Sequence, residues 1–146
     1  MPTVSHTAVA RTSVHDAFEY VSDYRTVPNW FFGITRFVPK GELDHGLGAV
    51  YDSAVKVGPK TLDSVVKVTE FEQDELVTLT SIEGFSTNSR WEFAPTDDGQ
   101  TRLSVDFTYD LPGGIAGKML GKLLEPFAVQ AVKYIDTTLR RQLEQG

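Results

Sequence analysis

The feature that most constrains the fold is a long helical pattern at the C-terminal end of the chain. Residues 111–145 open with Leu-Pro-Gly-Gly, and apolar or small side chains then recur at i, i+4 spacing at Ile115, Met119, Leu123, Phe127, Ala131, Ile135, Leu139 and Leu143. A second apolar row beside them widens the stripe, and charged residues occupy the opposite face. Such a helix would span roughly 45 Å, so the preceding residues must supply a surface that covers its apolar side.

The residues before this helix first show short helical patterns and then an alternation of apolar and polar side chains. Residues 3–10 favour a first strand, Ser13 is placed to cap a short helix that ends near Asp23, and Pro28 suits the first turn of a second short helix. Alternating segments joined by short turns follow at residues 34–42, 49–57, 61–72, 76–82, 87–94 and 101–111. Strands joined in this way form an antiparallel meander with one buried face. The sequence predicts an α+β fold: a curved antiparallel sheet of about six or seven strands around the long helix.

Composition narrows the class of protein. The 146 residues suit one domain, 1–146, and a hydrophobic content of 40% is that of a globular chain. A formal charge of −6 argues against a nucleic-acid partner, and the absence of Cys excludes disulfides and cysteine-based metal sites. Since neither an apolar leader nor an 18-residue apolar run is found, we expect a soluble, cytoplasmic protein.

Three short motifs carry a resemblance to a known family. They are Asp23-Tyr24 with Val27-Pro28-Asn29-Trp30 after the first helix, Val55-Lys56-Val57-Gly58 in the middle, and Ser89-Arg90-Trp91-Glu92-Phe93 before the last hairpin. With this element order, the chain resembles the polyketide cyclase/dehydrase and lipid-transport family of the START-like, helix-grip superfamily. The resemblance implies that an apolar or aromatic molecule binds between sheet and helix, and that only some members catalyse a reaction.

Strand parity identifies the side chains that would surround such a molecule. Inward positions combine large apolar groups with several hydroxyls, and an unpaired buried hydroxyl costs about 1–3 kcal/mol. A cavity would use these hydroxyls to orient a guest, whereas in a filled core backbone groups or ordered water must satisfy them. The predicted ligand-binding residues are Trp30, Tyr51, Ser53, Val55, Ser64, Val66, Ser89, Trp91, Phe93, Phe107, Tyr109, Ile115, Met119, Leu120, Leu123 and Phe127.

The first part of the long helix contains residues that weaken a helix. Glycines crowd the segment Gly113–Glu125 and Pro126 follows it, which is typical either of a mobile lid hinged at the proline or of close packing against the sheet. Lys118 and Lys122 would allow at most a transient membrane contact, and a solvated helix flank explains them equally well.

Candidate catalytic residues are few. His6, His15 and His45 have no partner at the usual metal-ligand spacing, so we expect no metal and no cofactor. Tyr51, Ser89 and Tyr109 are positions that could polarise a carbonyl group. Because no ionisable side chain is expected deep in the cavity, the leading hypothesis is a carrier or sensor of a lipid, isoprenoid or aromatic polyketide, acting as a monomer or homodimer. The alternatives are a polyketide aromatase/cyclase or dehydratase, and a protein-interaction module of the toxin–antitoxin or stress-related kind.

Overall fold

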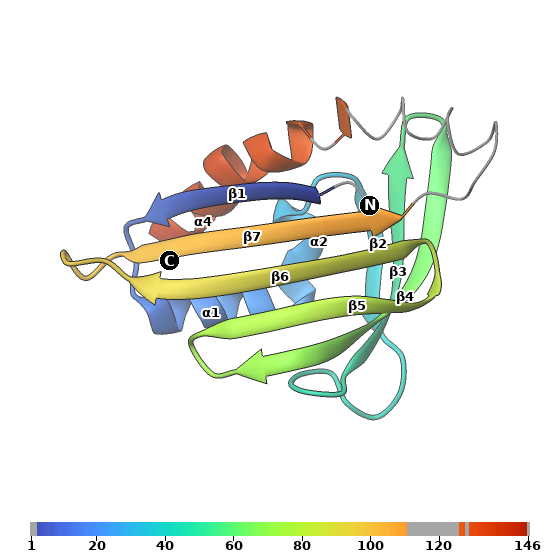
Figure 1. Ribbon diagram of the computed structural model, residues 1–146, viewed down its shortest axis with the longest axis horizontal. Coiled ribbons are helices and arrows are strands. Elements are labelled where there is room, and N and C mark those ends of the chain that lie inside the picture. The colour runs from blue at the N-terminus through green and yellow to red at the C-terminus, as the bar shows by residue number, and fades with distance from the viewer. Residues whose placement is uncertain (1–2, 111–125, 128, 146) are drawn as a thin grey trace.

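The structure is a computed structural model that describes residues 3–110, 126–127 and 129–145. Short helices follow the first strand, a run of six strands comes next, and a helix ends the chain (Figure 1). The elements are β1 (Thr3–Ala10), α1 (Val14–Ser22), the 3₁₀ turn η1 (Tyr24–Thr26), α2 (Val27–Trp30), β2 (Ile34–Pro39), β3 (Val50–Val57), β4 (Lys60–Glu72), β5 (Leu76–Gly84), β6 (Ser86–Pro95), β7 (Thr101–Asp110), and a C-terminal helix over residues 129–145 that contains the π-helical turn η2 (Ile135–Leu139) and α4 (Arg140–Gln145).

The strands form one seven-stranded antiparallel sheet in the order β1-β7-β6-β5-β4-β3-β2. The predicted α+β class and curved antiparallel sheet are confirmed. β2 is an edge strand and ends at Pro39, which has no N–H to donate to a neighbouring strand. In Figure 1, β2 and β3 run across the direction of β5, β6 and β7, so the sheet curls sharply between its two halves.

The curl falls where β4 pairs with β5. The register of this pair shifts between Val65 and Val66 and again between Val68 and Glu70. Each such bulge inserts an extra residue on one strand, bends the strand and increases its local right-handed twist. The two shifts explain how a single sheet wraps around the helices rather than remaining open.

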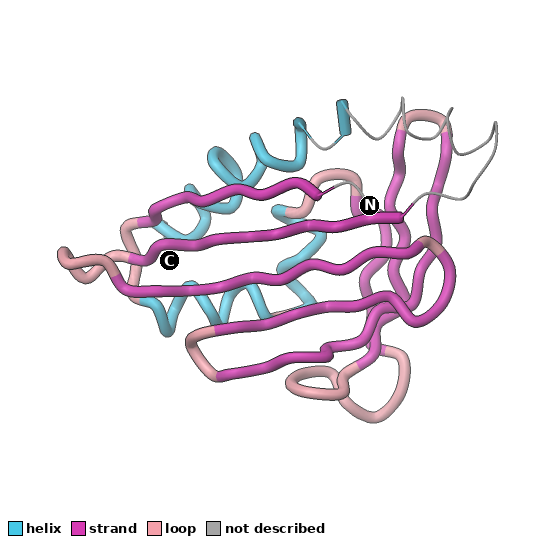
Figure 2. Tube along the Cα trace, viewed as in Figure 1, coloured by secondary structure: helices cyan, strands magenta, loops and turns pink. Residues whose placement is uncertain are grey.

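The short helices form where the sequence predicts them. The Ser13 side chain accepts a hydrogen bond from the Asp16 backbone N–H at the start of α1, and a proline lies in the first turn of α2. In the view of Figure 2, both helices lie behind the strands. Side chains from α1, α2 and the C-terminal helix therefore meet the inner face of the sheet.

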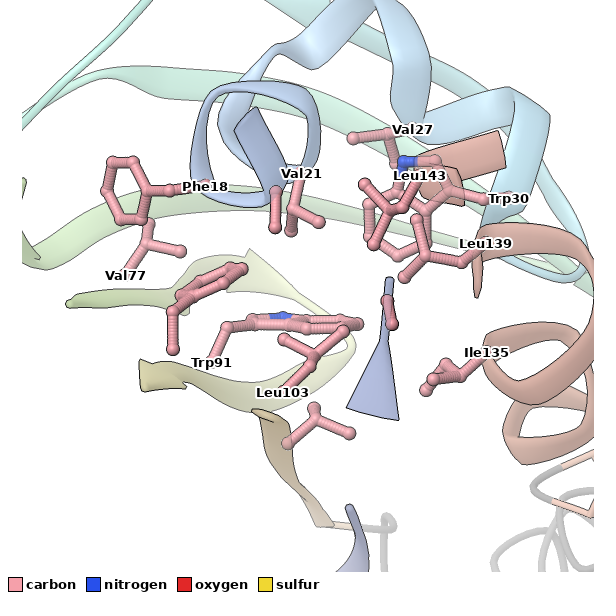
Figure 3. Packing of buried hydrophobic residues seen from close by; sticks show 14 of the residues in the cluster. Phe18, Val21, Val27, Trp30, Val77, Trp91, Leu103, Ile135, Leu139 and Leu143 are labelled. Atoms are coloured by element: carbon pink, nitrogen blue, oxygen red, sulfur yellow. The ribbon is translucent and has the colours of Figure 1, made fainter. Parts of the chain in front are cut away.

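Apolar side chains from these three helices and the sheet form the main core (Figure 3). Phe18 of α1 is fully buried and contacts the rings of Phe71 and Phe93 edge-on, with ring centroids 5.3 and 5.2 Å apart. Leu139 on the C-terminal helix is also fully buried. The predicted apolar series is therefore confirmed in the described part of that helix, where Ile135, Leu139 and Leu143 are buried.

The segment Gly113–Glu125 lies outside the described residues, together with Ile115, Met119, Leu120, Leu123, Lys118 and Lys122. The expectations of a lid, of a hinge at Pro126 and of a lysine contact with lipid therefore stay predictions. Among the described helices, none is long and apolar enough to cross a membrane.

Candidate ligand-binding site

A partly open cavity of about 100 Å³ lies between the curled sheet and the short helices. Its wall is mostly apolar and aromatic, with side chains from β3 to β7, from α2 and from Phe127 near the C-terminal helix. Ten of the predicted ligand-binding residues lie on this wall: Trp30, Tyr51, Ser53, Val55, Ser64, Val66, Ser89, Trp91, Phe107 and Phe127.

Two other predicted residues in the described part of the chain, Phe93 and Tyr109, are not on this wall. Phe93 has the expected inward direction and is buried, but it lines neither this cavity nor the neighbouring one because Phe18 packs against it. Tyr109 lines the neighbouring cavity. Strand parity thus gave the direction of these side chains correctly. Their position along the strand decides whether they line a cavity or pack against another side chain.

The hydroxyl groups on the wall have different environments. Ser53 and Ser64 lie directly opposite each other on β3 and β4, and Ser89 projects from β6. Tyr51 donates its hydroxyl proton to the backbone carbonyl of Asp44 over 2.8 Å, so a backbone group already satisfies this hydroxyl. Burial, reinforced by the negative charge of Asp44, raises the pKa of Tyr51 to about 12. Tyr51 is therefore a neutral wall residue whose proton is already engaged, which makes it a poor candidate for polarising a carbonyl.

Aromatic rings separate this cavity from the neighbouring one. Trp30 is buried, as expected, and its indole N–H donates to the Thr26 hydroxyl at 3.1 Å. Its ring meets Trp91 edge-on at 5.2 Å between centroids, and Phe31 meets Phe107 edge-on at 6.4 Å. These four rings, with Phe127, line both cavities. They form a shared wall, which we call the aromatic partition.

The second cavity has a volume of about 50 Å³ and lies between the aromatic partition, β1, β7 and the C-terminal helix. His6 of β1 lines it, and the Nε2 atom of His6 lies 2.7 Å from Oδ1 of Asp136 on the C-terminal helix. We expected no ionisable side chain deep in the cavity, and His6, whose side chain is 20% exposed, lines the wall of this second cavity. Sequence reasoning missed the pair because its two residues lie at opposite ends of the chain.

A cluster around a second histidine also escaped sequence reasoning. His15 and Glu19 are spaced i, i+4 on α1, and with Asp74 they offer ligand atoms that lie within 4.8 Å of one another. The Gln73 amide donates to both carboxylates at 2.8 and 2.9 Å, and His15 Nδ1 lies 3.1 Å from Asp74. Hydrogen bonds within this exposed group already link its members, and exposed acidic groups commonly gather without a metal.

Two of the arginines on the outer face of the sheet form ion pairs there. Arg36 donates to Asp52 and Asp63 at 3.1 and 3.0 Å, and Arg90 donates to Glu70 at 2.9 Å. Their side chains are 43% and 40% exposed. Because pairs this exposed contribute little to stability, these arginines are surface groups and not part of the cavities.

Residues 1–144 match the family model described as polyketide cyclase/dehydrase and lipid transport. The chain belongs to this family. The match to the polyketide cyclase/dehydrase and lipid-transport family spans the walls of both cavities and the C-terminal helix. A search of curated proteins finds no significant match.

Solved structures agree with this family assignment at the level of fold. The TTHA0849 protein of Thermus thermophilus has a TM-score of 0.81 and 17% identity, with 97% of each chain covered. A START superfamily protein of Mycobacterium smegmatis has a TM-score of 0.74 and 19% identity, covering 98% of this chain and 97% of that one. The major latex-like protein 151 of Panax ginseng has a TM-score of 0.61 and 13% identity, covering 90% and 97%. At such identities the likeness establishes a shared START-like fold.

Proposed function

We propose that this protein binds a small, mostly apolar molecule inside the curled sheet and acts as its carrier or sensor. The observation that supports this most directly is the pair of apolar cavities on either side of the aromatic partition. Membership of a family described by cyclase, dehydrase and lipid-transport members points in the same direction. The cytoplasmic location and the monomeric or homodimeric state stay predictions.

Cavity size limits the choice of ligand. The two cavities measure about 100 and 50 Å³, below the roughly 300–1,000 Å³ of sites for drug-sized ligands. An apolar cavity of about 150 Å³ is enough to bind benzene. Each of the two cavities is smaller than that, so any ligand requires wall side chains to move, and of the ligand classes considered a compact aromatic molecule requires the least movement.

An aromatic ligand would also provide van der Waals contacts to the side chains of the cavity wall. Side chains beside a void lose dispersion attraction, and burial of apolar surface adds roughly 25 cal/mol per Å². A ligand with a single ring is therefore expected to bind with a dissociation constant between about 1 μM and 1 mM.

The test uses p-xylene as the apolar probe. Both tryptophans of the chain line both cavities, so their fluorescence reports binding directly. Wild type should show saturable binding. Ser64→Leu, which places a larger side chain on the cavity wall, should weaken it by about tenfold or more, because a change of about 1.4 kcal/mol is a factor of ten. Thr61→Leu on the same strand, where the side chain is exposed, is the matched control and should bind like wild type.

Absence of saturable binding by wild type, or undiminished binding by Ser64→Leu, would contradict the proposal. Native mass spectrometry of protein purified from its own host should in addition reveal a co-purifying small molecule.

The aromatase/cyclase or dehydratase alternative gains one specific observation, the imidazole of His6 on the wall of the second cavity. A histidine is the side chain most often used for proton transfer near neutral pH. The interaction-module alternative required a filled core with an apolar groove outside it, and the two cavities that the described residues line between sheet and helices count against a filled core.

A further inference from the structure

We propose that His6, oriented by Asp136, accepts a hydrogen bond from an acidic hydroxyl group of the ligand. The second cavity would then select aromatic molecules that carry a phenolic or enolic hydroxyl. This inference rests on the proposed ligand-binding function and assigns the chemical class of the ligand.

The first step concerns the protonation of the imidazole. His6 Nε2 lies 2.7 Å from Oδ1 of Asp136, and an ionised carboxylate can only accept a hydrogen bond. The ring proton is therefore on Nε2. In the neutral ring, Nδ1 then carries the lone pair and is the atom left to bond a ligand.

The second step concerns the position of the ring. His6 is fixed on β1 by pairing opposite Val105 of β7, and Asp136 belongs to the C-terminal helix. The hydrogen bond thus joins the edge strand to the helix beside the second cavity, whose wall includes His6. A carboxylate that holds one nitrogen of an imidazole fixes both the tautomer and the plane of the ring.

The third step concerns the rest of the wall. The second cavity is lined by apolar and aromatic side chains such as Val4, Phe107 and Ile135, and Tyr109 is the one hydroxyl-bearing side chain among the described residues there. The His6 side chain is 20% exposed, so most of its surface is shielded from water. A site of this kind discriminates strongly against a molecule that lacks the matching hydroxyl, because the polar group of the protein is then left without a partner.

The experiment compares p-cresol with p-xylene, two molecules of nearly the same shape in which a hydroxyl replaces a methyl group. Tryptophan fluorescence measures both affinities. Wild type should bind p-cresol at least about fivefold more tightly than p-xylene, within the range that one hydrogen bond provides. His6→Leu should abolish this preference, so that the ratio of the two affinities falls to about one.

Two further variants separate the orienting role from a general disturbance. Asp136→Ala removes the partner of the ring and should reduce the preference without abolishing binding of p-xylene. His15→Leu changes an exposed histidine on α1 that lies on neither cavity wall, and should keep the full preference.

A direct signal comes from nitrogen-15 NMR of the His6 imidazole in the wild-type protein. Saturation with p-cresol should shift the Nδ1 resonance as the lone pair accepts a hydrogen bond, and p-xylene should leave it in place. This measurement decides the matter even where His6→Leu fails to fold, because it needs no variant.

Equal affinity for the two probes, a preference that persists in His6→Leu, or an unchanged Nδ1 resonance would each overturn the inference while leaving the binding function intact. Failure of both probes to bind would instead remove the proposed function itself.

Discussion

At the scale of single residues, the partner of a polar side chain decides its role. Strand parity placed Tyr51 and Ser53 on the same inner face, and both are buried there. Their hydroxyls nevertheless differ, because that of Tyr51 is bonded to the carbonyl of Asp44 in the preceding turn. Direction follows from the two-residue period of a strand, whereas the partner depends on how a turn folds back. The sequence could therefore predict the direction of each side chain but not the partner of its hydroxyl group.

The same limit applies to His6. Its position in a strand was predictable, but its contact with Asp136 joins residues 130 positions apart. No local pattern signals such a pair, since it arises only when β1 and the C-terminal helix pack together.

The pair of His15 and Asp74 gives a prediction about pH. The hydrogen bond to Asp74, followed by its negative charge, raises the pKa of His15 above 6.5. A histidine whose pKa is raised on folding stabilises the protein fully below the unfolded pKa and loses this contribution as pH rises through the folded pKa. The melting temperature of wild type should therefore exceed that of His15→Gln by more at about pH 5.5 than at about pH 8.5.

Asp74→Asn provides the check on this assignment. It should produce the same pH-dependent loss, and the double variant should lose no more than either single one, since both changes remove one interaction. A difference from wild type that is the same at both pH values would contradict it.

At the scale of elements, the bend between β4 and β5 depends on a close approach of two backbones. Gly84, at the end of β5, has φ 79°, and a Cβ atom there would lie 2.3 Å from the carbonyl oxygen of Asp63 and 3.0 Å from the Cα of Ser64. Only glycine allows the two strands to approach this closely while the sheet turns. The alternating pattern predicted both strands, but bulges and close approaches depend on the partner strand and have no signal within a single strand.

Gly84→Ala should therefore be strongly destabilising. The positive φ alone costs an L-residue roughly 1–2 kcal/mol, and the backbone clash adds to this. Gly99→Ala is the matched control, because Gly99 has φ 77° with nothing within 4 Å of the added Cβ atom. Urea unfolding should show a clearly larger loss for Gly84→Ala, and equal losses would mean that the approach of the strands is not important for the bend.

At the scale of the whole molecule, the inside of the sheet has a filled region and a hollow region. The filled region contains Phe18, Leu139 and Leu143, which are buried with side chains from α1, α2 and the sheet. The hollow region contains the two cavities on either side of the aromatic partition. The sequence predicted the fold because periodicity and turn residues are local signals. The volume of a cavity depends on how side chains from many elements meet, so no local pattern in the sequence predicts it.

This division predicts that stability and binding can be changed separately. Leu139→Ala in the filled region should cost about 2–5 kcal/mol of unfolding free energy, yet leave the affinity for p-xylene within about twofold of wild type under conditions where the protein is folded. Val129→Ala, at a side chain 52% exposed on the same helix, should cost less than about 0.5 kcal/mol. A large loss of p-xylene affinity in Leu139→Ala would show that the two regions are coupled.

The pairing of β1 with β7 also bears on how the chain is made. Thr3 lies opposite Thr108 in this pair, so β1 has no neighbouring strand until β7 has been made. Contacts this distant in sequence slow folding, and an unpaired strand edge is prone to aggregate in the meantime. The sheet is therefore complete only after β7 has been made, and the segment that carries His6 takes its final place among the last strands of the sheet.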